Sequence, residues 1–177
     1  MGEELVIVKF GGSILREGSN YLEAARHVGN LLREGRKVIV VVSAMKGVTN
    51  ALIDIAESKR SSKNIDFIAE LHRCTVQEIT GDDSYLLEVE RILEELAKTA
   101  KAIEILGEVT PRVRDLLLSF GERLSAILMH AALDKSGIES TWLTGWDAGI
   151  VSDDSFGEAK PIHELSSKLV KGKLQPL

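Results

Sequence analysis

The chain has 177 residues, 44% of them hydrophobic and 28% charged, which is enough to bury the core of one globular domain. A formal net charge of -5 and an aromatic content of 5% argue against nucleic acid or an anionic membrane as a partner. The single cysteine, Cys74, excludes an internal disulfide and a thiolate metal cluster, so we expect a reducing, cytoplasmic setting.

The N-terminus lacks the features of a targeting or membrane segment. Met1–Glu4 starts acidic and leads into an apolar strand, unlike a cleavable signal peptide. The longest wholly apolar run, Val38–Val42, is too short to span a bilayer. We therefore expect a soluble protein.

The first predicted element is an apolar strand, Leu5–Phe10, that runs into Gly11, Gly12 and Ser13. Lys9 in a buried strand is costly unless a counter-charge meets it. Two glycines supply positive-φ geometry and let backbone N–H groups approach a ligand closely. A cation and bare backbone donors at the end of a strand suit a phosphate. The alternative is a tight strand-to-helix turn with a lysine that reaches water.

A helix and a second strand complete a right-handed βαβ unit. Asn20 and Glu23 have the spacing of a capping box at the start of the helix, and Gly35 stands where a helix-ending glycine is expected. The second strand, Val38–Val42, is apolar without alternation, which predicts burial on both faces in a parallel sheet.

The loop after the second strand, Ser43–Asn50, is a second candidate binding segment, because ligands of open parallel sheets bind beyond the carboxyl ends of the strands. Ser43, Thr49 and the first amides of the next helix, expected over Ala51–Lys59, could hold a carboxylate or a phosphate. For Thr49 alone, a helix N-cap is the alternative.

Two helices broken near Gly81–Asp83 are expected over residues 64–102. The second has an apolar stripe opposite a charged, mostly acidic face, which is typical of a solvated surface. Such a helical insertion could serve as a cap or as an oligomer contact, and the residues leave both open.

Thr110 followed by Pro111 predicts the start of a long helix that is apolar on more than one side. Glycine inside a helix costs about 1 kcal/mol, so Gly121 needs a packing or ligand reason. Glu122 lies on a mostly apolar face and needs a cationic partner, either an internal side chain or a substrate ammonium group. The plainly polar residues form one narrow stripe: Asp115, Ser119, Arg123 and His130.

The remaining segments are a third strand over Ile138–Leu143, a long loop over 144–161 and a short helix over His163–Val170. The loop carboxylates do not have the spacing of a calcium loop, so we expect solvated side chains and no metal site. These carboxylates are Asp147, Asp153 and Asp154. The motifs GxxxxGK[ST], GxGxxG and HExxH do not occur, so any phosphate chemistry belongs to another architecture.

Four segments, in this order, resemble the aspartate kinase family of the amino acid kinase superfamily. They are Lys9–Ser13, Ser43–Asn50, Ser119–Glu122 and Asp153–Ala159. The first ends in serine where the family usually has threonine. Other members of the superfamily share the lysine and glycines but lack the pairing of the second and third segments.

The resemblance implies a three-layer α/β/α sandwich with a mainly parallel sheet, incomplete here, and a helical insertion at about 64–102. It also implies phosphoryl transfer from ATP with Mg²⁺ to the β-carboxylate of L-aspartate, the first step toward lysine, threonine and methionine. By similarity, Lys9 would be catalytic and would bind phosphate together with Phe10, Gly11, Gly12 and Ser13. Aspartate would be bound by Ser43, Thr49 and Glu122.

The resemblance covers only the N-terminal portion of the family's catalytic domain. The stretch that supplies an active-centre arginine and aspartate, the nucleotide-binding half and the regulatory ACT domains are not matched in residues 1–177, so we expect the chain alone to be inactive. We expect a homo-oligomer, such as a dimer. Two alternatives stay open: a non-catalytic module for aspartate binding or subunit assembly, and another phosphotransferase of the superfamily.

Overall fold

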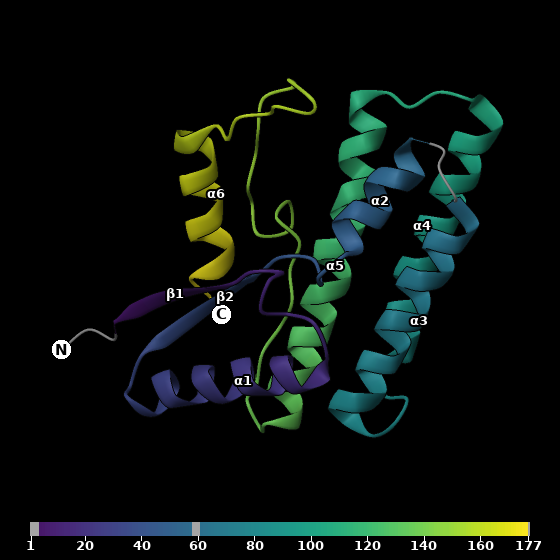
Figure 1. Cartoon of the computed structure of the whole chain (residues 1–177). Helices are drawn as coiled ribbons and strands as arrows, with labels where there is room; N and C mark the ends of the chain where they lie inside the picture. The colour runs from purple at the N-terminus through teal and green to yellow at the C-terminus, as the bar shows by residue number, and fades with distance from the viewer. Residues whose placement is uncertain (1–3, 58–60, 177) are drawn as a thin grey trace.

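The computed structural model of the chain describes residues 4–57 and 61–176. Two strands and six helices follow one another along these residues (Figure 1). They are β1 (Leu5–Phe10), α1 (Gly18–Arg33), β2 (Lys37–Val42), α2 (Val48–Ala56), α3 (Ser61–Thr80), α4 (Leu86–Leu106), α5 (Pro111–Lys135) and α6 (His163–Leu174). The predicted mixed α/β class, with a parallel sheet and a helical insertion, is confirmed.

The two strands pair in parallel, with Leu5 opposite Lys37 and Phe10 opposite Val42. Because α1 connects them, the unit is the predicted βαβ unit, and both strands present their carboxyl ends at the same edge. Within the described residues the sheet contains these two strands alone. One face, which includes Val8 and Val40, packs against the hydrophobic core.

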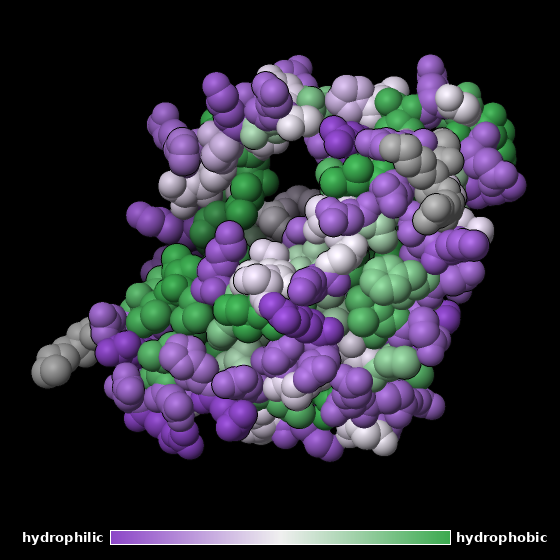
Figure 2. Space-filling model, in the orientation of Figure 1, coloured by the Kyte–Doolittle hydropathy of each residue, from purple (hydrophilic) through white to green (hydrophobic). Residues whose placement is uncertain are grey.

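The other face of the sheet is exposed. The relative exposures of Leu5, Ile7 and Val41 are 57%, 65% and 42%, and Figure 2 shows hydrophobic side chains gathered over the strands. The prediction that Val38–Val42 is buried on both faces is therefore wrong, because none of the described helices covers this side.

Helix α5 is the centre of the helical layer and packs against α1, α2, α3, α4 and β2. Its start is confirmed: the Val113 amide donates to Thr110 Oγ1 at 3.3 Å, and Pro111 occupies the first turn. By length and composition α5 could cross a membrane, but most of it is buried inside the protein, as for a core helix. Its surroundings make it the core helix of this fold.

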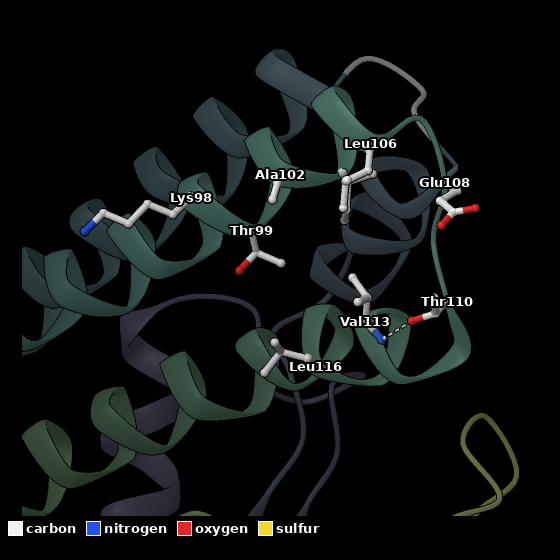
Figure 3. Close-up of a pocket in the computed structure, with 9 residues that line it drawn as sticks. Lys98, Thr99, Ala102, Leu106, Glu108, Thr110, Val113 and Leu116 are labelled. Atoms are coloured by element: carbon white, nitrogen blue, oxygen red, sulfur yellow. Dashed lines mark hydrogen bonds between the residues drawn. The ribbon is translucent and has the colours of Figure 1, made fainter.

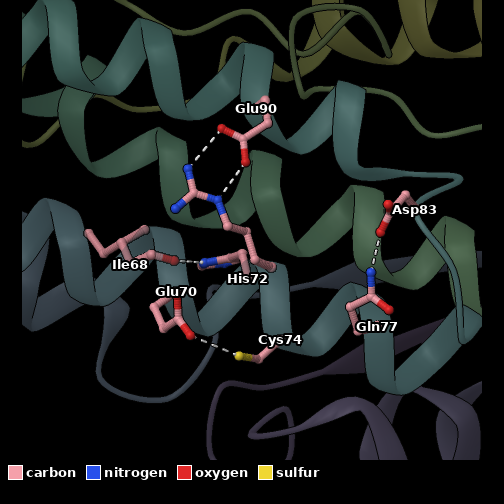
Figure 4. A network of polar contacts seen from close by, with 8 residues as sticks. Ile68, Glu70, His72, Cys74, Gln77, Asp83 and Glu90 are labelled. Atoms are coloured by element: carbon pink, nitrogen blue, oxygen red, sulfur yellow. Dashed lines mark hydrogen bonds and ion pairs between the residues drawn. The ribbon is translucent and has the colours of Figure 1, made fainter.

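The helical insertion consists of α3 and α4, which pack on each other and on α5. The break predicted near Gly81 is confirmed, and Gly81 takes a φ of 76° there. His72 of α3 is fully buried, and its Nδ1 contacts the Ile68 carbonyl oxygen at 2.6 Å (Figure 4). The insertion extends beyond residues 64–102 at both ends, since α3 begins at Ser61 and α4 ends at Leu106.

The capping box at Asn20 is not formed. Helix α1 begins two residues earlier, and the Asn20 side chain accepts a hydrogen bond from the Arg16 amide at 3.2 Å. The first amide of the helix, Gly18, instead donates to Glu78 Oε2 of α3 at 2.7 Å. A distant helix therefore caps α1.

Three other predicted boundaries differ from the structure. Helix α2 begins at Val48 and ends at Ala56, and the predicted end at residues 58–60 lies outside the described residues. Helix α6 continues past Val170 to Leu174. Residues 138–143 form no strand, because side chains rather than a neighbouring strand hold them, as with Trp142 Nε1, which donates to Glu88 Oε2 of α4 at 2.9 Å.

Candidate functional site

The two loops that follow the strands are in direct contact. A Cβ atom at Gly12 would lie 2.5 Å from the Ala44 carbonyl oxygen, so only glycine permits this approach. The Ser43 amide donates to the Phe10 carbonyl oxygen at 3.1 Å, and the Lys46 amide donates to the Leu15 carbonyl oxygen at 3.0 Å. Backbone contacts therefore hold the segment Lys9–Ser13 directly against the segment Ser43–Asn50.

The predicted reason for the first pair of glycines is partly wrong. Neither Gly11 nor Gly12 is among the glycines with positive φ, so close approach and not a left-handed turn accounts for Gly12. The left-handed residue is Gly47, with a φ of 90°, and it is the N-cap residue of α2. Thr49 is thus inside the first turn of α2, and its alternative role as an N-cap is excluded.

Gly121 joins the third segment to the first two. A Cβ atom at Gly121 would lie 2.7 Å from Ala44 Cβ and 3.2 Å from Val48 Cγ1. Packing therefore answers why α5 contains a glycine here: the helix rests directly on the second loop. Ala44 is held between Gly12 on one side and Gly121 on the other.

The chemically active side chains around this contact are accessible. Lys9, Ser13, Thr49 and Glu122 are exposed, and Ser43 is half-buried. The expected desolvation of Lys9 and Glu122 is therefore wrong in this structure, and burial forces neither to find a counter-charge. Among the described residues, no hydrogen bond or ion pair occupies the Lys9 ammonium or the Glu122 carboxylate.

The carboxyl ends of the two strands lie next to an open part of the molecule. Figure 1 places the carboxyl ends of β1 and β2 beside α5 and below the segment that leads to α6. Figure 2 shows an opening through the surface between α6 and the side formed by α2 and α5. A ligand could approach the strand ends from there.

The fourth segment, Asp153–Ala159, contacts the N-terminal end of α5. Its tip is held by the Gly157 amide, which donates to Asp115 Oδ2 at 2.8 Å, and by the Arg112 guanidinium, whose Cζ is 5.6 Å from the centre of the Phe156 ring. Asp115 precedes Gly121 by six residues, about 9 Å along a helix. The structure therefore brings three predicted segments together and places the fourth at the N-terminal end of α5.

The loop carboxylates organise turns. Backbone N–H groups of Ser155 and Lys160 hold the pKa of the Asp153 carboxyl below its usual range. Asp147 Oδ2 accepts from Thr144 Oγ1 at 2.5 Å. Asp147 is exposed, as expected for a solvated side chain, and Asp153 is half-buried; both also hold turns through these hydrogen bonds. Within the described residues, no group of three or more His, Cys, Asp or Glu side chains could hold a metal ion.

A separate groove lies between the end of α4 and the start of α5 (Figure 3). It has a volume of about 330 Å³ and is lined mainly by apolar side chains such as Ile103, Leu106 and Val113. It includes none of the predicted site residues, so it is not part of the candidate site.

Sequence reasoning missed two contributors to the site. Ala44 was part of a predicted segment, but its role as the contact point was not anticipated. The polar stripe of α5 was noted, yet nothing indicated that Asp115 and Arg123 hold the segment that leads to α6. The signal that could have shown this is a polar stripe on an otherwise apolar helix, which requires a polar neighbour.

A parallel βαβ unit whose strand-end loops meet under a long helix defines an α/β domain, and ligands of that class generally bind beyond the carboxyl ends of the strands. The particular family follows from comparison with known proteins. The chain belongs to the amino acid kinase family, whose sequence model matches residues 4–176.

Aspartokinases are relatives over most of the chain. Aspartokinase 2, chloroplastic, of Arabidopsis thaliana is 32% identical over 167 residues, which are 89% of this chain and 30% of that protein. E. coli aspartokinase III in complex with aspartate and ADP (R-state) superposes with a TM-score of 0.87 at 25% identity, over 98% of this chain and 38% of that one. Its complex with lysine and aspartate (T-state) gives a TM-score of 0.82 at 25% identity, over 99% and 38%. The resemblance to aspartate kinases is confirmed, and the chain spans 30% to 38% of these relatives' length.

Proposed function

We propose that this chain is the N-terminal portion of an aspartate kinase catalytic domain, which transfers the γ-phosphoryl group of ATP to the β-carboxylate of L-aspartate. The observation that carries the proposal is the contact at Ala44. Glycines on both sides, at positions 12 and 121, let the two strand-end loops and α5 meet, with distances of 2.5 Å and 2.7 Å to the missing Cβ atoms. The elements β1, α2 and α5 each carry one accessible polar side chain close in sequence to these positions: Lys9, Thr49 and Glu122.

Lys9 and the following turn would handle the phosphates. The Lys9 ammonium is exposed at the end of β1 and would neutralise the charge that develops on the transferred phosphoryl group. Phe10, Gly11, Gly12 and Ser13 would lie along the phosphates, and the two glycines would expose their backbone N–H groups. Such a site works by positioning and electrostatics, so no covalent enzyme intermediate is needed.

The opposite side of the contact would hold aspartate. Thr49 lies in the first turn of α2, where amides and a hydroxyl are available to a carboxylate, and Ser43 follows β2 directly. The Glu122 carboxylate would accept the α-ammonium group of aspartate. An exposed carboxylate without an internal partner among the described residues is suited to that task.

Magnesium would enter as part of the MgATP substrate. Magnesium in kinase sites is held largely by substrate phosphates and by one or two carboxylates. By the same proposal, the groups that complete the active centre belong to the part of the relatives' length that this chain does not match.

A second candidate function is a non-catalytic module that binds aspartate or assembles with another subunit. The exposed apolar face of the sheet favours it, since Leu5 and Ile7 are more than half exposed. For the assembly we propose a homodimer. A third candidate function is that of a phosphotransferase of the same family with an acceptor other than aspartate. The proposed setting is the cytoplasm, although the Arabidopsis relative is named chloroplastic.

Calorimetric titration of L-aspartate and of MgATP, separately and together, with a hydroxamate trap for aspartyl phosphate, tests the proposal. We expect the 177-residue chain to bind aspartate and to form no aspartyl phosphate. Binding of neither ligand would contradict the proposed site. Turnover by the chain alone would contradict its being only a portion of the active centre.

A further inference from the structure

The polar stripe of α5 is a docking strip for residues 138–157. His130 Nδ1 lies 2.8 Å from Ser140 Oγ, the Arg123 guanidinium faces the Trp146 ring, and Asp115 accepts from the Gly157 amide. Along α5 the three contact residues run from 130 to 123 to 115, in steps of about two helical turns. Their partners run in the opposite sense, from 140 to 146 to 157. Residues 138–157 therefore run antiparallel to α5, as the yellow-green segment beside α5 shows in Figure 1.

Arg123 lies at the middle of this docking strip and joins three elements. Its Nη2 donates to Glu95 Oε2 of α4 at 2.6 Å, and its Cζ lies 4.9 Å from the centre of the Phe120 ring and 5.8 Å from that of Trp146. The side chain is only 13% exposed. A guanidinium between two aromatic rings holds them through its planar face, which lysine does not reproduce.

The hydrogen bonds of Arg123 are not saturated. Its Nε is buried and has no partner within the described residues. An arginine whose only role is a salt bridge is most stable when it makes a bidentate contact, with two N–H groups donating to one carboxylate. In Arg123 a single N–H group donates to Glu95, and the guanidinium contacts the rings of Phe120 and Trp146. Stacking on the rings is therefore its main structural role.

We infer that residues 138–157 form a strap, and that Arg123 is a positioning residue that holds the strap beside Glu122. Arg123 follows Glu122 directly on α5, and its side chain contacts the strap at Trp146. The strap therefore crosses α5 at the helical turn that carries Glu122, the residue proposed to meet an amino acid's ammonium group. The link to the amino acid rests on the proposed function, whereas the strap itself does not.

Hydrogen exchange tests whether the strap moves as one body. The exchange rate of the Gly157 amide, eleven residues beyond Trp146, is measured in three proteins. These are the unchanged chain, the Arg123→Lys variant and the Trp146→Leu variant. We expect exchange at Gly157 to become about 3–10-fold faster in both variants, the range that corresponds to one lost cation–π contact. Arg114→Lys, an exposed arginine of α5, is the matched control and should leave the rate unchanged. Asp115→Asn, which weakens the direct contact, should also raise it.

A second readout separates positioning from general stability. In Arg123→Lys, the dissociation constant for L-aspartate should rise about fivefold while that for MgATP stays within twofold, because Arg123 contacts Glu95, Phe120 and Trp146 and not Lys9 or the glycine turn. The thermal midpoint should stay close to that of the unchanged chain, since the charge near Glu95 is kept. Trp146→Phe keeps a ring opposite Arg123 and should restore both exchange and aspartate affinity relative to Trp146→Leu.

Two results would overturn the inference. If Asp115→Asn speeds exchange at Gly157 but Arg123→Lys and Trp146→Leu do not, the contacts are independent and no strap exists. If the unchanged chain binds aspartate and Arg123→Lys binds it equally well, Arg123 does not position the site. Failure of the unchanged chain to bind aspartate would instead contradict the proposed function, and the exchange rates would still decide the strap.

Discussion

Ala44 and its two neighbouring glycines determine how closely the parts of the candidate site approach one another. The atoms that a side chain would meet at Gly12 belong to backbone, and those at Gly121 belong to Ala44, Val48 and Leu52. Neither set can swing aside like the end of a long side chain. The geometry of the site therefore depends on two missing methyl groups.

Gly121→Ala should destabilise the fold by up to about 2 kcal/mol. Overpacking costs about 1–3 kcal/mol, and the higher helix propensity of alanine offsets about 1 kcal/mol of that cost. Urea unfolding followed by circular dichroism measures it. Gly172→Ala in α6 is the matched control, because its Cβ would meet nothing within 4 Å, and it should stabilise or be neutral. Equal effects of the two substitutions would remove packing as the reason for Gly121.

His72 gives the fold a dependence on pH. Burial lowers the pKa of His72 from 6.5 to about 4, against a smaller opposing effect of the Ile68 carbonyl (Figure 4). Between these values the unfolded chain binds a proton that the folded chain does not, so stability falls as the pH drops from about 6.5 toward 4. The loss from this residue is at most about 3 kcal/mol.

The free energy of unfolding, measured from pH 7 to pH 4, checks this account of His72. We expect His72→Gln to flatten the decline, whereas His163→Gln, which changes an exposed histidine, should leave it in place. A decline of the same slope in both variants would assign the pH dependence to other groups.

At the scale of the elements, α1 and α5 are joined by a buried hydrogen bond. Tyr21 Oη and Ser125 Oγ lie 2.7 Å apart, and both side chains are fully buried. Burial raises the pKa of Tyr21 well above its usual range, and the contact with Ser125 opposes this. The tyrosine is therefore neutral at all ordinary pH values.

Tyr21→Phe should cost about 1–2 kcal/mol, because it leaves the Ser125 hydroxyl buried and unpaired. The double variant with Ser125→Ala should recover much of the loss, since removing both partners leaves no orphaned group. Denaturant unfolding of the four members of this cycle measures the coupling. A zero coupling energy would show that the hydrogen bond does not join the helices.

Local signals in the sequence predicted the elements that depend on local chemistry. Thr110 and Pro111 marked the start of α5, and Gly81 marked the break between α3 and α4, because a cap or a turn is made by neighbouring residues. The start of α1 was misjudged because its cap, Glu78, lies 60 residues away. No local pattern carries that information.

The third strand illustrates the same limit. Residues 138–143 have the composition of a strand, but a strand exists only where a neighbour supplies hydrogen bonds. In this structure His130 and Glu88 hold the segment through Ser140 and Trp142 instead. The order of the site segments was predictable, while the exposure of Lys9 and Glu122 depends on what covers the sheet and helix, which composition does not show.

At the scale of the whole molecule, the described residues form a helical core with one sheet face left open. The even-numbered side chains of the strands face this core, and the opposite face, with Leu5 and Ile7, is exposed. The chain spans 30% of the Arabidopsis aspartokinase 2 and 38% of E. coli aspartokinase III. The proposal that it contributes the aspartate and phosphate side of a larger active centre accounts for both facts.

The most direct test of that proposal is calorimetric titration of L-aspartate into the unchanged chain and into Glu122→Gln. Loss of a hydrogen bond to a charged group costs about 1.5–3 kcal/mol, so aspartate binding should weaken about tenfold or more. MgATP binding should be unchanged, and Glu23→Gln, at an exposed glutamate of α1, should alter neither ligand. Equal affinity of Glu122→Gln and the unchanged chain for aspartate would contradict the assignment of this helix to the amino acid.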